Sequence, residues 1–249
     1  MNVDSATRLR NAIDQTIPDN LMSETPSDKK FWANFVARKN IASNGVLLFD
    51  HSEDLLVRTE KIGRDKREVL KRSNAMDKLI LKETDKLVAD WETGANEYDG
   101  IIYVMFLRRS GSTVPLYIGK AETLGKGEGN LSANIKGLHS SSQKFARWGN
   151  NYQYHIGDLS AVVLFGHKEK YQNNKYRAWA SSLFFEFPTL KPLLREPVYF
   201  WTTAWEKTET GPWQDFGATR LTFLEYLLIG IASAEFPKNL LNREGQNRG

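Results

Sequence analysis

Two tyrosines and one glutamate are the residues whose types and positions most suggest chemistry. Tyr103 and Tyr117 stand in two apolar runs joined by a polar turn, where both phenols can face one pocket. Glu225 stands in an otherwise apolar stretch, and burial of a carboxylate is unfavourable unless it is paired or bound to a cation. Ordinary explanations exist: tyrosines in strands commonly pack in the core, and the helix dipole stabilises a glutamate in a first turn. The spacing of these residues alone does not decide between a chemical role and an ordinary structural one.

The charge of the chain is mildly biased towards polyanions. The net charge is +4 and the pI is about 9.1, with basic residues concentrated in 58–86 and 120–147. Such clusters are typical of nucleic-acid-binding surfaces, although an ordinary solvated surface has a similar composition. Charge therefore favours a polyanionic ligand without identifying one.

A β-hairpin is predicted to position the two tyrosines. Residues 100–107 and 114–119 are rich in β-branched and aromatic residues, and the turn between them contains Ser110-Gly111-Ser112. Glu225 belongs to a strongly apolar helix predicted over 220–234, with Thr219 as its N-cap. The hairpin and this helix are the elements on which any common site depends.

The rest of the chain predicts an α+β fold with a small, mainly antiparallel sheet flanked by helices. We expect a helical N-terminal extension over 1–95, serving as a DNA grip or dimer arm, and a second domain over 96–249. Further helices are predicted over 6–15, 29–38, 52–91, 131–148 and 171–187, and further strands over 160–165 and 197–204.

Several classes of protein are excluded or disfavoured by composition. The chain has no cysteine, which rules out disulfides and thiolate zinc sites. No apolar run reaches the roughly 18 to 20 residues of a membrane span, and the N-terminus lacks the features of a signal peptide. A cytoplasmic location and no membrane partner are therefore expected.

The sequence of the hairpin, G-I-I-Y followed by Y-I-G-K, resembles the signature motif of the GIY-YIG nucleases. The resemblance continues downstream, where Glu225 precedes Leu228-Ile229, and Pro237 precedes Leu240-Leu241-Asn242. It covers about residues 100–242 and implies a GIY-YIG-like fold. It also implies metal-dependent hydrolysis of DNA phosphodiester bonds that leaves 5′ phosphate and 3′ hydroxyl ends.

The resemblance assigns roles to individual residues. Tyr103 would orient or deprotonate the attacking water, with its pKa lowered by nearby cations, and Tyr117 would bind a phosphate oxygen or the water. Glu225 would hold one Mg²⁺ or Mn²⁺ ion. Further catalytic candidates are Arg147, His139, Lys120 and Asn242, and further DNA-binding candidates are Lys126, Lys136, Lys144 and His155.

One departure concerns the arginine of the family's helix after the hairpin. Asn134 stands where that arginine is expected, so either Lys136 supplies the cation or Arg147 has taken the role. We prefer Arg147, because it is the arginine between the hairpin and the third predicted strand and a guanidinium binds phosphate in a bidentate way.

Within this resemblance we expect a site-specific restriction or defence endonuclease acting on double-stranded DNA. A palindromic target would favour a homodimer, because one active site cuts one strand. The alternatives are a structure-specific repair or mobile-element nuclease, a catalytically inactive nucleic-acid-binding relative, and an RNA-degrading toxin.

Overall fold

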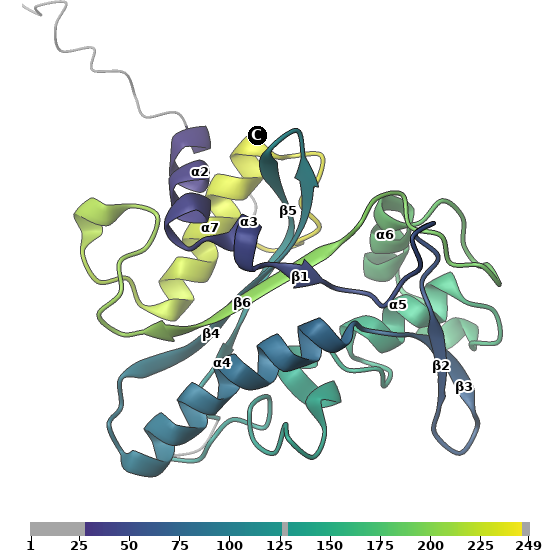
Figure 1. Cartoon of the computed structure of the whole chain (residues 1–249), viewed down its shortest axis with the longest axis horizontal. Coiled ribbons are helices and arrows are strands. Elements are labelled where there is room, and N and C mark those ends of the chain that lie inside the picture. The colour runs from purple at the N-terminus through teal and green to yellow at the C-terminus, as the bar shows by residue number, and fades with distance from the viewer. Residues whose placement is uncertain (1–27, 126–128, 246–249) are drawn as a thin grey trace, which may run out of the picture.

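The computed structural model describes residues 28–125 and 129–245, which form an α+β fold around a four-stranded antiparallel sheet of order β1-β6-β4-β5 (Figure 1). This confirms the predicted fold class. The helices are α2 (Asp28–Arg38), α3 (Ile41–Asn44), α4 (Asn74–Thr93), α5 (His155–Val163), α6 (Asn174–Leu183) and α7 (Leu221–Glu235), with short 3₁₀ turns η2 (Ser142–Arg147), η3 (Glu169–Tyr171) and η4 (Gln214–Phe216). The strands are β1 (Val46–Leu47), β2 (Thr59–Ile62), β3 (Arg67–Leu70), β4 (Tyr98–Arg109), β5 (Ser112–Glu122) and β6 (Tyr199–Glu206).

The predicted hairpin is confirmed as β4 and β5. The two-residue turn Ser110-Gly111 joins them, and both residues have positive φ, 46° and 78°, as a hairpin turn matched to the strand twist requires. The antiparallel register places Tyr103 opposite Gly119 and Met105 opposite Tyr117. The tyrosines therefore lie on neighbouring strands, on the same face of the sheet.

The two faces of the sheet bury different clusters. Tyr103 and Met105 pack with residues of α4, α5 and α6, whereas Ile102 and Val104 pack with α2 and α7. Figure 1 shows α4, α5 and α6 on one side of the strands and α2 and α7 on the other. The Tyr103 side chain thus points to the face covered by α4, α5 and α6, whereas α7, which carries Glu225, covers the other face.

Residues before position 96 contribute to the sheet as well as covering it. The strand β1 pairs with β6, and α2, predicted over 29–38, is confirmed and packs on α7. The helix predicted over 6–15 lies outside the described residues. The domain boundary at 95/96 stays a prediction.

The helix predicted over 52–91 is correct only in its second half. Residues 59–70 form the antiparallel ribbon β2–β3, and α4 begins after Ser73, whose hydroxyl accepts the Met76 N–H at 3.0 Å. Charged and apolar residues alternate along the ribbon at a spacing close to that of an amphipathic helix, so the hydrophobic pattern predicted a helix for this segment.

The strand predicted over 160–165 is wrong, because residues 160–163 form the end of α5 and Leu164 makes only an isolated bridge to Thr189. Every residue of α5 is buried, so its sequence is a short apolar run that does not distinguish a helix from a strand. The preceding loop approaches α5 closely at Gly157. A Cβ on Gly157 would lie 2.0 Å from the carbonyl oxygen of Asn151.

Other boundaries also needed correction. Residues 131–148, predicted as one or two helices, form turns and η2, and the helix predicted over 171–187 is limited to α6 after η3. The strand predicted over 197–204 is confirmed as β6, and the helix over 220–234 as α7.

Thr219 is not the N-cap of α7. Its hydroxyl accepts the Gly211 N–H at 3.0 Å, while Asp99 on β4 accepts the Leu221 N–H at 3.2 Å. Asp99 therefore satisfies the first turn of α7 from the sheet and connects this helix to β4. Within the described ranges, no helix has both the length and the apolar character that crossing a membrane requires.

Candidate active site

Tyr103 lies in the interior, across the backbone of Gly119. A Cβ built on Gly119 would come within 2.5 Å of the Tyr103 hydroxyl oxygen, so the position must be glycine for the phenol to reach this place. The ring stacks on Phe200 and meets Phe145 and Trp148 edge-on, at centroid distances of 6.0, 6.0 and 5.8 Å. These rings hold the phenol in one orientation.

Tyr117 lies beside Tyr103, half-buried, with 6.4 Å between the ring centroids. Its ring contacts Trp179 of α6 at 4.9 Å and His155 of α5 at 5.2 Å. The hairpin and the helices α5 and α6 therefore meet at the two tyrosines. The sequence predicted that the two phenols lie together, and they do.

His155 is buried beside Tyr117 and is not a surface contact for DNA. Its Nδ1 shares a hydrogen bond of 2.7 Å with the Tyr176 hydroxyl. Burial lowers the pKa of His155 well below its usual value, and the charges of Lys175 and Arg147 lower it further. The imidazole is thus neutral at pH 7.

Arg147 is exposed at the end of η2, where its guanidinium donates to the Gln153 carbonyl at 3.1 Å. Its positive charge lowers the pKa values of Tyr103 and Tyr117, against the stronger effect of burial. Arg147 therefore lies close enough to influence both phenols, which supports the preference for it over Lys136.

Lys175, at the start of α6, is a further site residue that the sequence analysis did not single out. Its Nζ lies 4.9 Å from the ring centroid of Tyr117 and 5.5 Å from that of Trp179. Burial lowers the pKa of Lys175 to about 8, and Arg147 and Arg243 lower it in the same direction. The spacing of Lys175 and Trp179 on one face of a helix was the available signal.

We refer to Tyr103, Tyr117, Arg147, His155, Lys175 and Tyr176 as the tyrosine site. The six residues come from β4, β5, the end of η2, and the N-terminal turns of α5 and α6. They surround the half-buried ring of Tyr117 with two cations and a neutral imidazole.

Glu225 lies on α7, which covers the other face of the sheet, and acts on the two tyrosines electrostatically. It is half-buried, and burial raises its pKa, while the charge and backbone N–H of Lys120 act in the opposite direction. The negative charge of Glu225 raises the pKa of both Tyr103 and Tyr117. Lys120 also forms an ion pair with Glu122 on the same strand.

The donor set around Glu225 fits a single hard cation. No group of three or more potential metal-ligating side chains is present in the part of the chain that the structure describes. One half-buried carboxylate that can be completed by waters and substrate phosphate oxygens is a suitable environment for Mg²⁺. The metal site at Glu225 stays a prediction.

Asn242 has a structural role that the sequence did not reveal. Its Oδ1 accepts the Ile118 N–H at 3.0 Å, and its Nδ2 donates to the Ile118 carbonyl at 2.8 Å. The amide thus pairs with the free edge of β5, next to Tyr117, as a neighbouring strand would. Asn242 holds the C-terminal segment against the strand that carries the site.

The remaining predicted residues lie elsewhere. His139 is exposed and pairs with Asp85 of α4, with 2.6 Å between Nε2 and Oδ1. Lys136 is exposed on the same turn segment, and Lys144 is exposed on η2. His139 therefore lies apart from the tyrosine site, because its segment forms turns against α4. Lys126 lies outside the described residues.

The expected lowering of the Tyr103 pKa is also wrong. Burial raises the pKa of Tyr103 well above its usual value, and the charges of Tyr117 and Glu225 add to this effect. Burial likewise raises the pKa of Tyr117 to about 12. Both residues are therefore neutral phenols at pH 7, which donate hydrogen bonds and do not act as phenolate bases.

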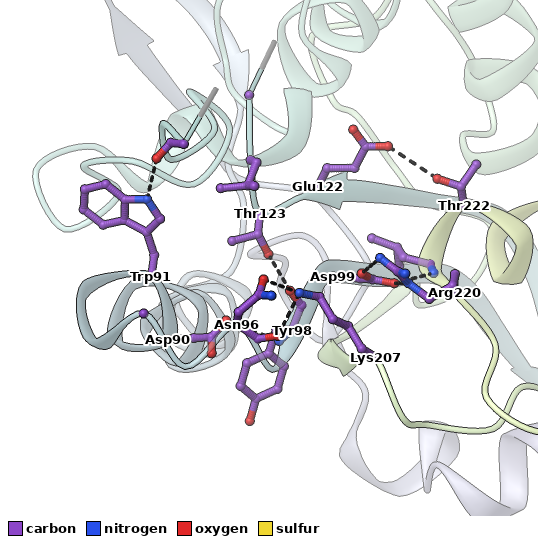
Figure 2. Close-up of a pocket in the computed structure, with 15 residues that line it drawn as sticks. Asp90, Trp91, Asn96, Tyr98, Asp99, Glu122, Thr123, Lys207, Arg220 and Thr222 are labelled. Atoms are coloured by element: carbon purple, nitrogen blue, oxygen red, sulfur yellow. Dashed lines mark hydrogen bonds and ion pairs between the residues drawn. The ribbon is translucent and has the colours of Figure 1, made fainter. Parts of the chain in front are cut away.

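A cavity of about 560 Å³ lies at the open end of the hairpin, between the C-terminus of α4 and the N-terminus of α7 (Figure 2). Its two cationic side chains, Arg220 and Lys207, are both engaged by neighbouring residues. Arg220 donates two hydrogen bonds of 2.5 Å to Asp99, and Lys207 donates to Asn96. Engaged cations offer less to a ligand than the cations beside Tyr117 in the tyrosine site.

Comparison of the chain with models of known families, with curated proteins and with solved structures finds no match.

Proposed function

We propose that this protein is a metal-dependent endonuclease that hydrolyses phosphodiester bonds of DNA at the tyrosine site. The observation that carries the proposal is the cluster of Tyr103, Tyr117 and His155, with the charges of Arg147 and Glu225 acting on both phenols. The group joins neutral hydrogen-bond donors, a proton acceptor, cations and one carboxylate. These are the functions that phosphodiester hydrolysis requires.

In this proposal water attacks phosphorus and the bond from phosphorus to the 3′ oxygen breaks. The proton of the water passes to Nε2 of His155, because burial keeps this imidazole neutral at pH 7. This role needs the tautomer in which Nδ1–H donates to Tyr176. The departing 3′ oxygen takes its proton from solvent, so the products carry a 5′ phosphate and a 3′ hydroxyl.

Tyr103 and Tyr117 orient the water and the phosphate as hydrogen-bond donors. Their raised pKa values support this assignment, because a phenol that keeps its proton can donate throughout the reaction. Arg147 and Lys175 stabilise the negative charge that increases on the phosphate oxygens in the transition state. Lys175 lies over Tyr117, so the two act on the same phosphate.

Glu225 would hold the metal ion, with Lys120 beside it. A bound Mg²⁺ ion supplies electrostatic stabilisation to the phosphate and the leaving oxygen. The raised pKa of the Glu225 carboxyl is consistent with a group that gains from a nearby cation. The site-specific restriction or defence role, a double-stranded substrate and a homodimer remain parts of the proposal.

A cleavage assay with matched variants tests this function. The full chain is incubated with plasmid DNA and with RNA, with Mg²⁺ or with EDTA, and the product ends are labelled. We expect Mg²⁺-dependent DNA cleavage with 5′ phosphate ends that Glu225→Gln abolishes and the exposed control Glu169→Gln retains. Wild-type protein that binds DNA and never cuts it would identify an inactive binding relative instead.

A further inference from the structure

The ribbon β2–β3 forms one wall of a second, separate cleft. Figure 1 shows the ribbon projecting from the body of the protein beside α5. A cavity of about 500 Å³ lies between the ribbon and the segment 165–171. We call it the ribbon cleft; it is lined by Lys61, Asp65, Lys66, Arg67, Glu68, Tyr152, Phe165, Gly166, His167, Lys168 and Tyr171.

The charge of the ribbon cleft is positive. Four of its lining side chains are cationic and two are acidic. Lys61, Lys66 and Lys168 are exposed, and none forms an ion pair within the described ranges 28–125 and 129–245. One of the acids is engaged internally, because Glu68 accepts a hydrogen bond from Thr59 at 2.5 Å. Three lysines are therefore free to meet an anion.

The floor of the cleft is a rigid aromatic stack. The rings of Tyr152 and Tyr171 are nearly parallel, with an interplanar angle of 4° and centroids 3.5 Å apart. The Arg67 guanidinium covers the other side of Tyr152 at 4.6 Å from its centroid. His167 bridges Tyr152 and the ribbon, through bonds of 2.9 Å to the phenol and 2.8 Å to the Glu68 carbonyl. The cleft is thus preorganised.

The cleft is connected to the tyrosine site by one short loop. Arg67 of the ribbon donates to Asn151 Oδ1 at 2.6 Å, and Tyr152 follows directly. The same loop begins at Arg147 and ends at His155, both of which belong to the tyrosine site. A long polyanion that occupies the tyrosine site therefore passes near the ribbon cleft, whereas a small ligand would not need it.

We propose that the ribbon cleft binds the phosphate backbone of duplex DNA and that the tip of the ribbon enters the adjacent major groove. This inference rests on the proposed function. The B-DNA major groove admits a two-stranded β-ribbon, and lysines along the ribbon and the opposite wall match a backbone on one side of that groove. Arg64, exposed at the tip, is the side chain placed to reach base edges.

Binding measurements on charge-matched variants test the inference. We compare wild type, the cleft variant Lys61→Ala/Lys66→Ala/Lys168→Ala, and the control variant Lys78→Ala/Lys82→Ala/Lys238→Ala, which removes the same charge from exposed lysines elsewhere. Affinity for a labelled 30-base-pair DNA duplex is measured in EDTA at several salt concentrations. Circular dichroism checks that each variant is folded.

The cleft variant should bind about tenfold or more weakly, with a salt dependence shallower by about 0.9 for each phosphate that the lysines no longer neutralise. The control variant should bind like wild type. Equal weakening of both variants, or none in the cleft variant, would overturn the inference while plasmid cleavage by the wild type still upheld the proposed function. The same comparison is made on an RNA duplex. If the cleft variant lost as much affinity for RNA as for DNA, the placement in the major groove would be contradicted, because A-form RNA does not admit a ribbon there.

Discussion

The Tyr103 phenol crosses Gly119 on the neighbouring strand so closely that a Cβ there would lie 2.5 Å from its hydroxyl oxygen. Tyr103 and Gly119 are direct partners in the β4–β5 register. The Tyr103 phenol can therefore occupy its buried position only because residue 119 is glycine, and the site depends on both residues.

Gly119→Ala should displace the Tyr103 ring and reduce the rate of DNA cleavage by about a hundredfold, since shifts of about 1 Å at a catalytic group have effects of this size. Crowding should also lower the free energy of unfolding by about 1–3 kcal/mol. Cleavage kinetics and denaturant unfolding measure the two effects.

Gly230→Ala is the matched control, because a Cβ at this α7 position meets nothing within 4 Å. A helical Gly→Ala change of this kind stabilises by about 0.5–1 kcal/mol and should leave cleavage unchanged. A fully active Gly119→Ala variant would show that the Tyr103 position is not needed.

Lys175→Met should lower the rate of cleavage by about 10²-fold, because a cation facing the phosphate is lost. In wild type, kcat/KM should fall as pH rises through about 8, where free Lys175 loses its charge. Lys175→Arg should remain active at higher pH. An identical decline above pH 8 in the arginine variant would assign that titration to another group.

The buried imidazole of His155 should make stability depend on pH. Its pKa in the folded protein lies well below the usual value of 6.5, so the unfolded chain binds the proton first on acidification. Its contribution is fully present above about pH 6.5 and is lost as pH falls towards the folded pKa. Urea unfolding from pH 7.5 to 5 should show this decline in wild type.

His155→Gln should show a shallower decline of stability over the same pH range. It should also lose cleavage activity at every pH, because glutamine cannot accept the proton of the attacking water. A wild-type stability that stays constant between pH 7.5 and 5 would contradict the buried, neutral state of His155.

Asn242→Ala should destabilise the protein by about 1–3 kcal/mol, because the N–H and carbonyl of Ile118 lose their partners at the edge of β5. Thermal unfolding provides the measurement. Asn239→Ala, which changes an asparagine three positions earlier in the same tail, should change stability by less than about 0.5 kcal/mol. Equal effects of the two would argue against the edge pairing.

The hairpin and α7 were predictable because their signals are local. A Ser-Gly turn between two β-rich runs defines β4 and β5, and an apolar run with Glu225 defines α7. The pairing of Tyr103 with Tyr117 followed from the hairpin alone. Local signals therefore identified the part of the site that lies on one supersecondary unit.

The rest of the site depends on contacts between distant segments. His155 lies in α5, which the sequence presented as a strand, and Lys175 reaches Tyr117 only because α6 packs beside α5. The raised pKa of Tyr103 is likewise a property of burial by Trp148, Phe145 and Phe200, which no spacing reveals.

The most direct test of the central claim is the single-turnover rate of plasmid cleavage in Mg²⁺ by wild type, Tyr103→Phe and Tyr226→Phe. Tyr226 is an exposed tyrosine of α7, which makes it the control for the loss of one hydroxyl group. A donor to the reacting centre contributes about 10²–10³ in rate. The account predicts a loss of that size in Tyr103→Phe with Tyr226→Phe unchanged. Cleavage by Tyr103→Phe at the wild-type rate would contradict it.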